Sequence, residues 1–336
     1  MYISLRNKKK KKKLKNSKRS YIKLKQNNSF SNLIKVFIIT LLSINFFIVL
    51  IKKEIIANKI NNNIRSNTTV GMCTLVKKEN RYIKYFIEFY KKIGYNNFYF
   101  YENNEIEDES LYDLEIIQKG IKEGFITIVD YKNVTIHIFS TFAYNCYEKF
   151  NSQNDWISFF DVDEYLILKQ KDSTIQEFLD NPKFNSCQQV QFSWMVFNDN
   201  DQLDYEDKPL IERFPIQTNF TYINRHVKSI IRGRLDYKKF KKNGNIHSIY
   251  NGIKACTSSG QKADNEYYIW PPDYEYGTLN HYVTKSVREY YDKRKRQFKH
   301  MSINAKKKFF DFFFMINDKT EEKVKIYNQI FHTHFK

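Results

Sequence analysis

The chain has 336 residues, which is enough for one large domain or two ordinary ones. Hydrophobic residues make up 42% of it, with 25 Tyr and 29 Phe, so a sizeable buried core is expected. The formal net charge of +19 is concentrated near the N-terminus, where residues 1–32 carry twelve Lys or Arg and no acidic residue. Residues 67–336 hold 39 basic and 36 acidic residues, a net charge of only +3. Nucleic acid is therefore not expected as a partner, because it needs a basic face on the folded domain.

An apolar segment follows the basic stretch. Residues 33–51 include sixteen uncharged residues in a row, and a helix over the whole segment would cover roughly 28 Å, close to the hydrocarbon thickness of a bilayer. We expect a transmembrane anchor there; a buried core helix is the alternative. The basic residues before the span place the N-terminus in the cytoplasm. The expected layout is a single-pass type II protein of the Golgi or endoplasmic reticulum membrane.

This layout divides the chain into four parts. Residues 1–32 form the cytoplasmic tail, 33–51 the anchor, 52–68 a polar stem and 69–336 the lumenal domain. Three Asn-x-Ser/Thr sequons agree with a lumenal location: Asn67, Asn133 and Asn219. The four cysteines are too few and too dispersed to indicate a disulfide scaffold. Cys73 lies inside an apolar run and is expected to be buried and not bonded.

The lumenal part alternates between strand-like and helix-like segments. The expected strands are 69–76, 98–101, 126–129 and 156–160, and the expected helices between them are 82–93, 111–122 and 140–150. Such alternation predicts an α/β fold with a mostly parallel, Rossmann-like sheet. Ligands of these sheets lie beyond the carboxyl ends of the strands. The polar residues that follow the strands are therefore expected to share one edge: Lys77, Glu79, Asn103, Asp161 and Asp163.

Three carboxylates within four residues follow the last of these strands. Asp161, Asp163 and Glu164 repel one another unless a cation or hydrogen bonds compensate. With one residue between them, Asp161 and Asp163 can reach the same hard cation, Mn²⁺ or Mg²⁺, which also binds phosphate oxygens. The alternative is an acidic turn that caps the segment beginning at Tyr165. The position after a buried strand favours the metal site.

The chain resembles the GT-A glycosyltransferases, most closely the family 92 and family-2-like group. The resemblance is carried by Cys73-Thr-Leu-Val-Lys-Lys-Glu-Asn80, Ile87-Glu-Phe-Tyr-Lys-Lys-Ile-Gly94, Phe98-Tyr-Phe-Tyr-Glu-Asn-Asn104, Asp155-Trp-Ile-Ser-Phe-Phe-Asp-Val-Asp-Glu164 and Leu279-Asn-His-Tyr-Val-Thr-Lys-Ser286. It implies transfer of a hexose, possibly galactose, from a nucleotide sugar with inversion, and it places Asp161 and Asp163 on the metal diphosphate. The donor would be a UDP-hexose and the acceptor a glycan.

The candidate donor-binding residues are Thr74, Lys77, Glu79, Asn103 and Lys228. Two departures from the family pattern affect the expected contacts. The turn after the second strand reads Tyr101-Glu102-Asn103 where relatives have Tyr-Asp-Asn, and Val196-Phe-Asn-Asp-Asn-Asp201 replaces a glycine-containing stretch.

The C-terminal half supplies further candidates. His281 is the expected third metal ligand, slightly ahead of His247. Lys228 and Arg232 could neutralise a diphosphate or be ordinary strand charges. Trp194 could stack on a sugar, although a core position is the better interpretation. The basic segment 287–300 is expected to form a helix with a solvated face.

An inverting reaction needs a carboxylate to take the proton from the attacking hydroxyl. The sequence does not choose among the candidates: Asp199, Asp201, Asp204, Glu206 and Glu164. We prefer Asp201 as the base. The other enzyme class considered is a metal-dependent nucleotidyltransferase, against which the lumenal location and the lack of a Gly-rich phosphate loop both count. A membrane-tethered, non-catalytic carbohydrate-binding protein with a degenerate GT-A fold is the alternative outside enzymes.

Overall fold

The structure is a computed structural model of the 336-residue chain. It describes residues 67–332, apart from 106, 133, 136, 171–172, 237, 239, 246–247, 251–252, 264–266 and 299–301, together with 40, 46–49 and 52. The chain divides into two units, Met1–Arg65 and Ser66–Lys336. Most of the expected anchor, 33–51, lies outside the described residues. Within the described residues, no helix is long and apolar enough to cross a membrane.

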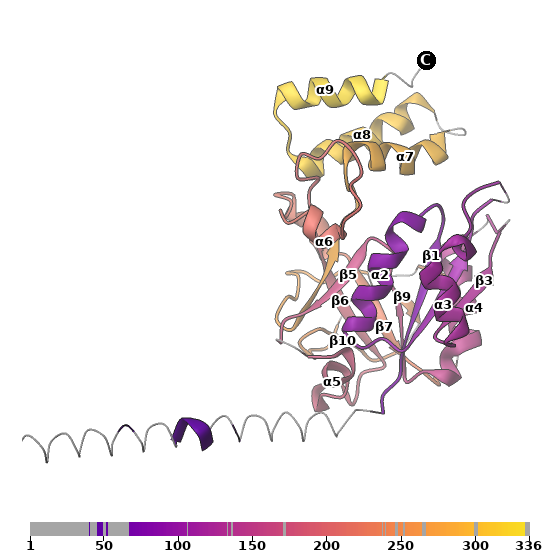
Figure 1. Ribbon diagram of the computed structural model, residues 1–336, viewed down its shortest axis with the longest axis vertical. Helices are drawn as coiled ribbons and strands as arrows, with labels where there is room; N and C mark the ends of the chain where they lie inside the picture. The colour runs from indigo at the N-terminus through magenta and orange to yellow at the C-terminus, as the bar shows by residue number, and fades with distance from the viewer. Residues whose placement is uncertain are drawn as a thin grey trace, which may run out of the picture. The chain divides into compact units, whose positions relative to one another are not determined.

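The second unit is built on a nine-stranded sheet with the order β3-β2-β1-β4-β7-β6-β11-β5, and β10 pairs with β6 (Figure 1). The strands are β1 (Val70–Val76), β2 (Asn97–Glu102), β3 (Ile126–Asp130), β4 (Trp156–Phe159), β5 (Glu164–Leu168), β6 (Gln189–Val196), β7 (Val227–Arg232), β10 (Ala255–Thr257) and β11 (Gly277–His281). A separate two-stranded sheet pairs β8 (Phe240–Asn245) with β9 (Ser248–Tyr250).

The expected parallel sheet is confirmed for one half only. Strands β3, β2, β1 and β4 run parallel to one another. Beyond β4 the sheet is mixed, because β7 is antiparallel to both β4 and β6, and β5 is antiparallel to β11. The chain turns directly from β4 into β5 without a crossover helix, so β5 cannot continue the parallel order. The result is a mixed α/β fold.

Helices α2 (Asn80–Lys92) and α4 (Ile138–Phe150) pack on opposite faces of the parallel half. Further helices are α3 (Glu115–Lys122), α5 (Ile175–Leu179), α6 (Leu210–Arg213), α7 (Val287–Phe298), α8 (Ile303–Asn317) and α9 (Glu321–His332). Helix α2 buries Ile83, Phe86 and Tyr90, which recur at helical spacing and form its core-facing side. The core under α2 includes Met72 of β1, and the core under α4 includes its neighbour Cys73, since successive strand residues face opposite sides.

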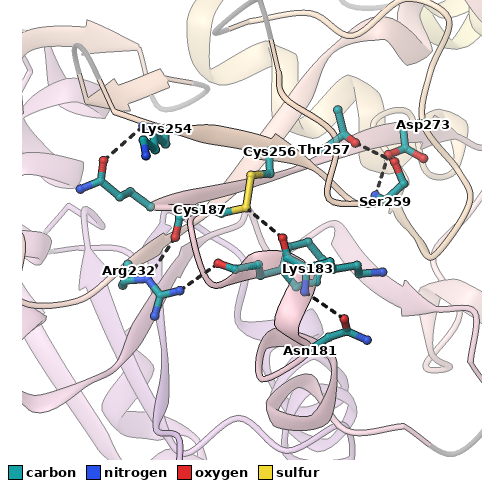
Figure 2. Close-up of a disulfide and its surroundings, with 11 residues drawn as sticks. Asn181, Lys183, Cys187, Arg232, Lys254, Cys256, Thr257, Ser259 and Asp273 are labelled. Atoms are coloured by element: carbon teal, nitrogen blue, oxygen red, sulfur yellow. Dashed lines mark hydrogen bonds between the residues drawn. A yellow bond between two sulfur atoms is a disulfide. The ribbon is translucent and has the colours of Figure 1, made fainter.

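The expectation that Cys73 is not bonded was wrong. Cys73 of β1 forms a disulfide with Cys146 of α4, and Cys187 pairs with Cys256 of β10. Each pair is separated by about 70 residues in the sequence, so the partners meet only once the sheet has formed. Figure 2 shows the second disulfide beside Arg232, whose guanidinium donates a hydrogen bond to the carbonyl of Cys187.

The contacts of Arg232 do not support the interpretation that it neutralises a diphosphate. Its guanidinium binds the backbone carbonyls of Phe184 and Cys187 and lies 4.2 Å from the ring centroid of Trp156. Because β7 is antiparallel to β4, Arg232 lies at the opposite edge of the sheet from Lys228. It is a structural residue of that edge and not a partner for the diphosphate.

The three C-terminal helices form a cluster of their own, in the orange to yellow part of Figure 1. Val287 and Tyr290 of α7 pack with Phe313 of α8 and Tyr327 of α9. The sequence indicated a basic helix with a solvated face over 287–300. The helix forms, but several of its side chains are buried, and Lys293 points toward the carboxylates described next.

Candidate active site

The carboxylates Asp161, Asp163 and Glu164 lie in a tight turn between β4 and β5. The backbone N–H of Glu164 donates to the carbonyl of Asp161 at 2.9 Å, and the N–H of Asp161 donates to Oε2 of Glu164 at 2.9 Å. The second contact holds Glu164 inward, where it is fully buried. The turn therefore places Asp161 at the carboxyl end of β4, and the hydrogen bond to Glu164 stabilises the turn.

Lys228, near the start of β7, faces this turn. Its side chain is 1% exposed, and its Nζ lies 2.8 Å from Oδ2 of Asp161 and 3.2 Å from Oε2 of Glu164. The antiparallel orientation of β7 brings its first residues to the edge at which β4 ends. Lys228 thus belongs to the carboxylate cluster and is not an ordinary surface charge; its predicted contact with the diphosphate stays a prediction.

Two further lysines bind Asp163. Oδ2 of Asp163 accepts from Nζ of Lys285 at 2.6 Å and from Nζ of Lys293 at 2.7 Å. Lys285 is only 3% exposed and has a positive φ of 53°, so the backbone after β11 turns sharply to aim it inward. The sequence analysis did not assign either lysine. Lys285 lies in the Leu279–Ser286 segment that resembles the family, and this resemblance could have pointed to it.

Burial and charge act against each other on these acids. Burial alone would raise the pKa of Asp161, but the attraction of Lys228 outweighs it and lowers the pKa. The pKa of Asp163 is well below its usual range because Lys285 and Lys293 overcome the effect of burial. Burial raises the pKa of Glu164 to about 8, although Lys228 opposes it. Glu164 therefore keeps its proton to a higher pH than the two aspartates do.

His281 closes the cluster at the end of β11. Its Nε2 lies 3.7 Å from Oδ1 of Asp163, which is too long for a hydrogen bond, and its ring centroid lies 4.3 Å from that of Trp194. Burial lowers the pKa of His281 to about 3, so the imidazole is neutral and keeps a lone pair. Its Nδ1 is buried without a hydrogen-bond partner in the described part of the chain.

Lysines already pair with both aspartates of the turn. The lysines occupy Oδ2 of Asp161 and Oδ2 of Asp163, while Oδ1 of Asp163 faces the neutral His281. Among the described residues, no three His, Cys, Asp or Glu side chains are placed as a complete metal site. Mg²⁺ is commonly bound by one or two carboxylates together with substrate phosphates, and such a site needs no complete protein cage.

The other predicted donor-binding residues lie at β1 and β2. Thr74 is fully buried within β1, and its hydroxyl has no hydrogen-bond partner among the described residues. The amide of Asn103 donates to the carbonyls of Tyr131 and Val134 and so holds the loop after β3. Lys77 pairs with Glu105 at 3.2 Å on the surface.

Glu79 is closer to the carboxylate cluster. It precedes α2 and lines a small cleft together with Lys285 and Lys293. Its charge contributes to the raised pKa of Lys293. The turn between β1 and α2 therefore lies beside the two lysines that bind Asp163.

Asp199 and Asp201 follow β6, and Asp201 lines a separate pocket. Lys319 bridges Asp199 and Asp201, and Lys323 also binds Asp201. The pocket has a volume of about 210 Å³ and a largely polar lining that includes Asn200. It shares no lining residue with the turn that holds Asp161 and Asp163. His247, the alternative metal ligand, lies outside the described residues.

The fold and the cluster define a mixed α/β protein whose acidic turn, at the carboxyl edge of a parallel half-sheet, is surrounded by lysines. Residues 66–329 match the family model for glycosyltransferase family 92, and the chain belongs to that family. Glycosyl transfer requires a sugar donor and an acceptor. A comparison with curated proteins finds no match.

One solved structure similar to this chain is the crystal structure of a glycosyltransferase involved in the glycosylation of the major capsid of PBCV-1. The two share 17% sequence identity with a TM-score of 0.22, and the match covers 49% of this chain and 60% of that chain. This chain therefore spans less than two thirds of that protein. At this level of similarity the likeness adds nothing to the account of the site.

Proposed function

We propose that this glycosyltransferase has a GT-A fold and transfers a hexose, possibly galactose, from a UDP-sugar to a glycan with inversion. The observation that carries the proposal is the pair of ionised aspartates, Asp161 and Asp163, placed beside three buried or half-buried lysines at the carboxyl edge of the sheet. A diphosphate needs such cations, and a divalent metal needs such carboxylates.

Within this proposal, Asp161, Asp163 and His281 hold Mn²⁺ or Mg²⁺. The metal would neutralise the charge that develops on the leaving diphosphate. Lys285 and Lys293 hold Asp163 ionised and add positive charge next to the expected position of the phosphates. Neutral His281 can donate its lone pair at Nε2, because burial keeps its pKa far below 7.

The proposed base is Asp201. Its side chain is 53% exposed, whereas those of Asp199 and Glu164 are fully buried and cannot meet an acceptor hydroxyl. Asp204 and Glu206 are 65% and 50% exposed, so exposure does not separate them from Asp201.

Hydrogen bonds from Lys319 and Lys323 lower the pKa of Asp201, so it is ionised at neutral pH, and the same bonds weaken it as a base. Its pocket shares no lining residue with the turn that holds Asp161 and Asp163, so this role requires the acceptor hydroxyl to reach both places. The acceptor oxygen would then attack the anomeric carbon as the diphosphate leaves and the proton passes to this carboxylate.

The remaining donor contacts are proposed for Thr74, Lys77, Glu79, Asn103 and Lys228. The buried hydroxyl of Thr74, which has no hydrogen-bond partner among the described residues, supports a polar ligand beside β1. We also propose that residues 33–51 anchor the protein as a type II protein of the Golgi or endoplasmic reticulum, with residues 1–32 cytoplasmic, 52–68 as stem and 69–336 lumenal.

One observation favours a second candidate, a non-catalytic carbohydrate-binding protein. The lysines already neutralise Asp161 and Asp163, so the cluster is balanced without any metal. UDP binding, measured calorimetrically with and without Mn²⁺, distinguishes the two. Glycosyl transfer at a metal site predicts binding that is at least about tenfold tighter with Mn²⁺. Equal binding in both conditions would contradict it.

A further inference from the structure

A row of aromatic side chains begins at His281 and leads away from the carboxylate turn. The ring of Trp194 lies 4.3 Å from that of His281 and is stacked at 5.0 Å on the ring of His226, the residue before β7. His226 in turn meets Tyr268 at 4.9 Å, edge to face. These rings connect the proposed metal ligand with the loop that precedes β11.

The row continues on the surface. The guanidinium of Arg225 lies 4.5 Å from the ring centroid of Tyr268 and 3.9 Å from that of Tyr222. Tyr222, in the 3-10 helix η4 (Thr221–Arg225), lies 6.1 Å from Trp270. The exposed fractions rise along this outer part: Tyr268 is 37% exposed, Tyr222 52% and Trp270 64%. We call the set Trp194, His226, Tyr268, Tyr222 and Trp270 the aromatic strip.

A cavity of about 530 Å³ opens beside the outer end of the aromatic strip. Tyr268 and Trp270 line it on one side, and Ser259, Asp273 and Glu275 add polar groups. Figure 2 shows Asp273 beside Ser259, whose backbone N–H donates to the carboxylate at 2.8 Å. Exposed aromatic rings next to hydrogen-bonding carboxylates and hydroxyls are the chemistry that suits a sugar.

We propose that the aromatic strip binds the acceptor as an extended, neutral oligosaccharide. A pyranose ring has one face of C–H groups, which can stack on the electron-rich face of an aromatic ring, and a rim of hydroxyls, which hydrogen-bonds to nearby polar groups. The inner end of the strip lies at Trp194 and His281, so the sugar that receives the transferred hexose lies at that end. The following sugars then lie toward Tyr222 and Trp270.

The aromatic rings distinguish the strip from the carboxylate turn. The donor diphosphate needs cations, and three buried or half-buried lysines, Lys228, Lys285 and Lys293, gather at the turn. The cavity beside the strip carries both signs of charge, from Asp273, Glu275 and Lys262, and exposed rings occupy its side. Such a surface offers a sugar ring both stacking and hydrogen-bonding groups. This assignment rests on the proposed glycosyl transfer, because it identifies one of its two substrates.

The strip is also held in place before any glycan binds. Arg225 contacts both Tyr222 and Tyr268, and its Nη1 donates a hydrogen bond to the hydroxyl of Tyr222. The backbone N–H of Ile269 donates to the carbonyl of Arg225 at 2.8 Å, which fixes the loop that carries Trp270. Rings that are already ordered lose little entropy on binding, so stacking contributes more to affinity.

The test uses the full-length chain, immobilised in detergent with UDP and Mn²⁺. The probe is a mixture of neutral oligosaccharides released from secreted glycoproteins, with free monosaccharides alongside, and mass spectrometry identifies what is retained. We expect the wild type to retain species longer than a disaccharide. Trp270→Ala and Tyr222→Ala should each weaken retention roughly tenfold, and Trp270→Tyr should restore most of it. Tyr112→Ala removes another exposed tyrosine, 53% accessible, and should have no effect.

Release of UDP from a UDP-hexose without acceptor is measured on the same variants. Unchanged release in Trp270→Ala together with lost glycan retention supports the assignment. If the wild type releases UDP but retains no oligosaccharide, or Trp270→Ala and Tyr222→Ala retain as much as the wild type, the assignment is overturned and the proposed transfer stands. If oligosaccharides are retained through the strip but no UDP-hexose releases UDP, the strip is a sugar-binding surface and the proposed transfer fails.

Discussion

Two Asp-x-Asp sequences in this protein follow a strand and meet lysines, yet their surroundings differ. Asp161-Val-Asp163 follows β4, and Asp199-Asn-Asp201 follows β6. In the first, the lysines come from β7, from the loop after β11 and from α7, and a neutral histidine lies beside the second aspartate. In the second, the lysines are Lys319 and Lys323, one in the turn after α8 and one in α9.

The difference shows that the spacing of two carboxylates does not by itself define a role. The pair after β4 is ringed by groups from separate elements that converge on one point, as a binding site requires. The pair after β6 connects the C-terminal helices to the sheet, and Asp201 keeps half of its surface in solvent. Under the proposed function, the first pair would bind the metal diphosphate and the exposed member of the second would accept the proton.

The largest effect is expected from Asp163→Asn. The substitution removes a charge that two lysines and the proposed metal share, so UDP release should fall on the order of 10⁴-fold, equivalent to several kcal/mol of lost stabilisation. The measurement is UDP release from the preferred UDP-hexose. Asp180→Asn, an exposed carboxylate elsewhere, is the control. If well-folded Asp163→Asn released UDP at the wild-type rate, the proposal that Asp161 and Asp163 bind the metal diphosphate would be wrong.

Asp201→Asn should separate the two steps of the reaction. Without a base, transfer to the glycan mixture should fall by about a thousandfold, while UDP release without acceptor changes little. Both are measured on one preparation by mass spectrometry and by UDP detection. Lys323→Gln is the matched control, because it loosens the same ion pair but leaves the carboxylate. Ordinary transfer by Asp201→Asn would show that this aspartate only tethers the C-terminal helices.

Lys228→Met and Lys319→Met compare the lysines of the two pairs. Lys319→Met leaves the fully buried Asp199 without its cation and should lower the free energy of unfolding by roughly 3 kcal/mol in denaturant titrations. Lys228→Met should lower it by less, because its charged partner Asp161 is 38% exposed. UDP release should fall for Lys228→Met only, since Lys319 does not contact Asp161 or Asp163. Equal losses of UDP release in the two variants would remove the distinction between the two regions.

The smallest effect concerns Glu164→Gln. Burial holds the pKa of Glu164 near 8, so a neutral amide should leave UDP release at pH 6.5 within about threefold of the wild type. Since the folded pKa lies above the unfolded value of 4.5, the stabilisation linked to this proton is complete below about pH 4.5 and is lost as pH rises through about 8. The melting temperature of the wild type should therefore fall relative to Glu164→Gln between pH 6 and pH 9. A constant difference would mean that Glu164 is ionised throughout.

Much of the parallel half-sheet could be predicted from the sequence. The alternation of apolar runs and helical spacing located β1 to β4 and α2 to α4, and the acidic residues after β4 were placed correctly at the strand's end. The antiparallel strands were not foreseen, because local periodicity does not report the direction in which a strand pairs. The two disulfides were also missed. Their partners lie about 70 residues apart, and local sequence patterns do not show which distant residues meet.

The lysines around Asp161 and Asp163 show most clearly what could not be predicted from the sequence. Lys228 was a candidate because it is a cation in a strand-like segment. Lys293 was assigned to a solvated helix face, because nothing in its neighbourhood shows that α7 packs with Lys293 directed at Asp163. That contact depends on how α7 packs with α8 and α9, and no local sequence pattern encodes such packing.

The most direct test of the central claim is metal-dependent UDP release by the purified chain. A panel of UDP-sugars is incubated with Mn²⁺, with and without a chelator, and free UDP is followed over time. The account predicts slow release from one preferred UDP-hexose, which the chelator abolishes and added Mn²⁺ restores. Release that is indifferent to the chelator, or no release from any UDP-sugar by folded protein, would show that the lysines alone balance Asp161 and Asp163 and would contradict the claim.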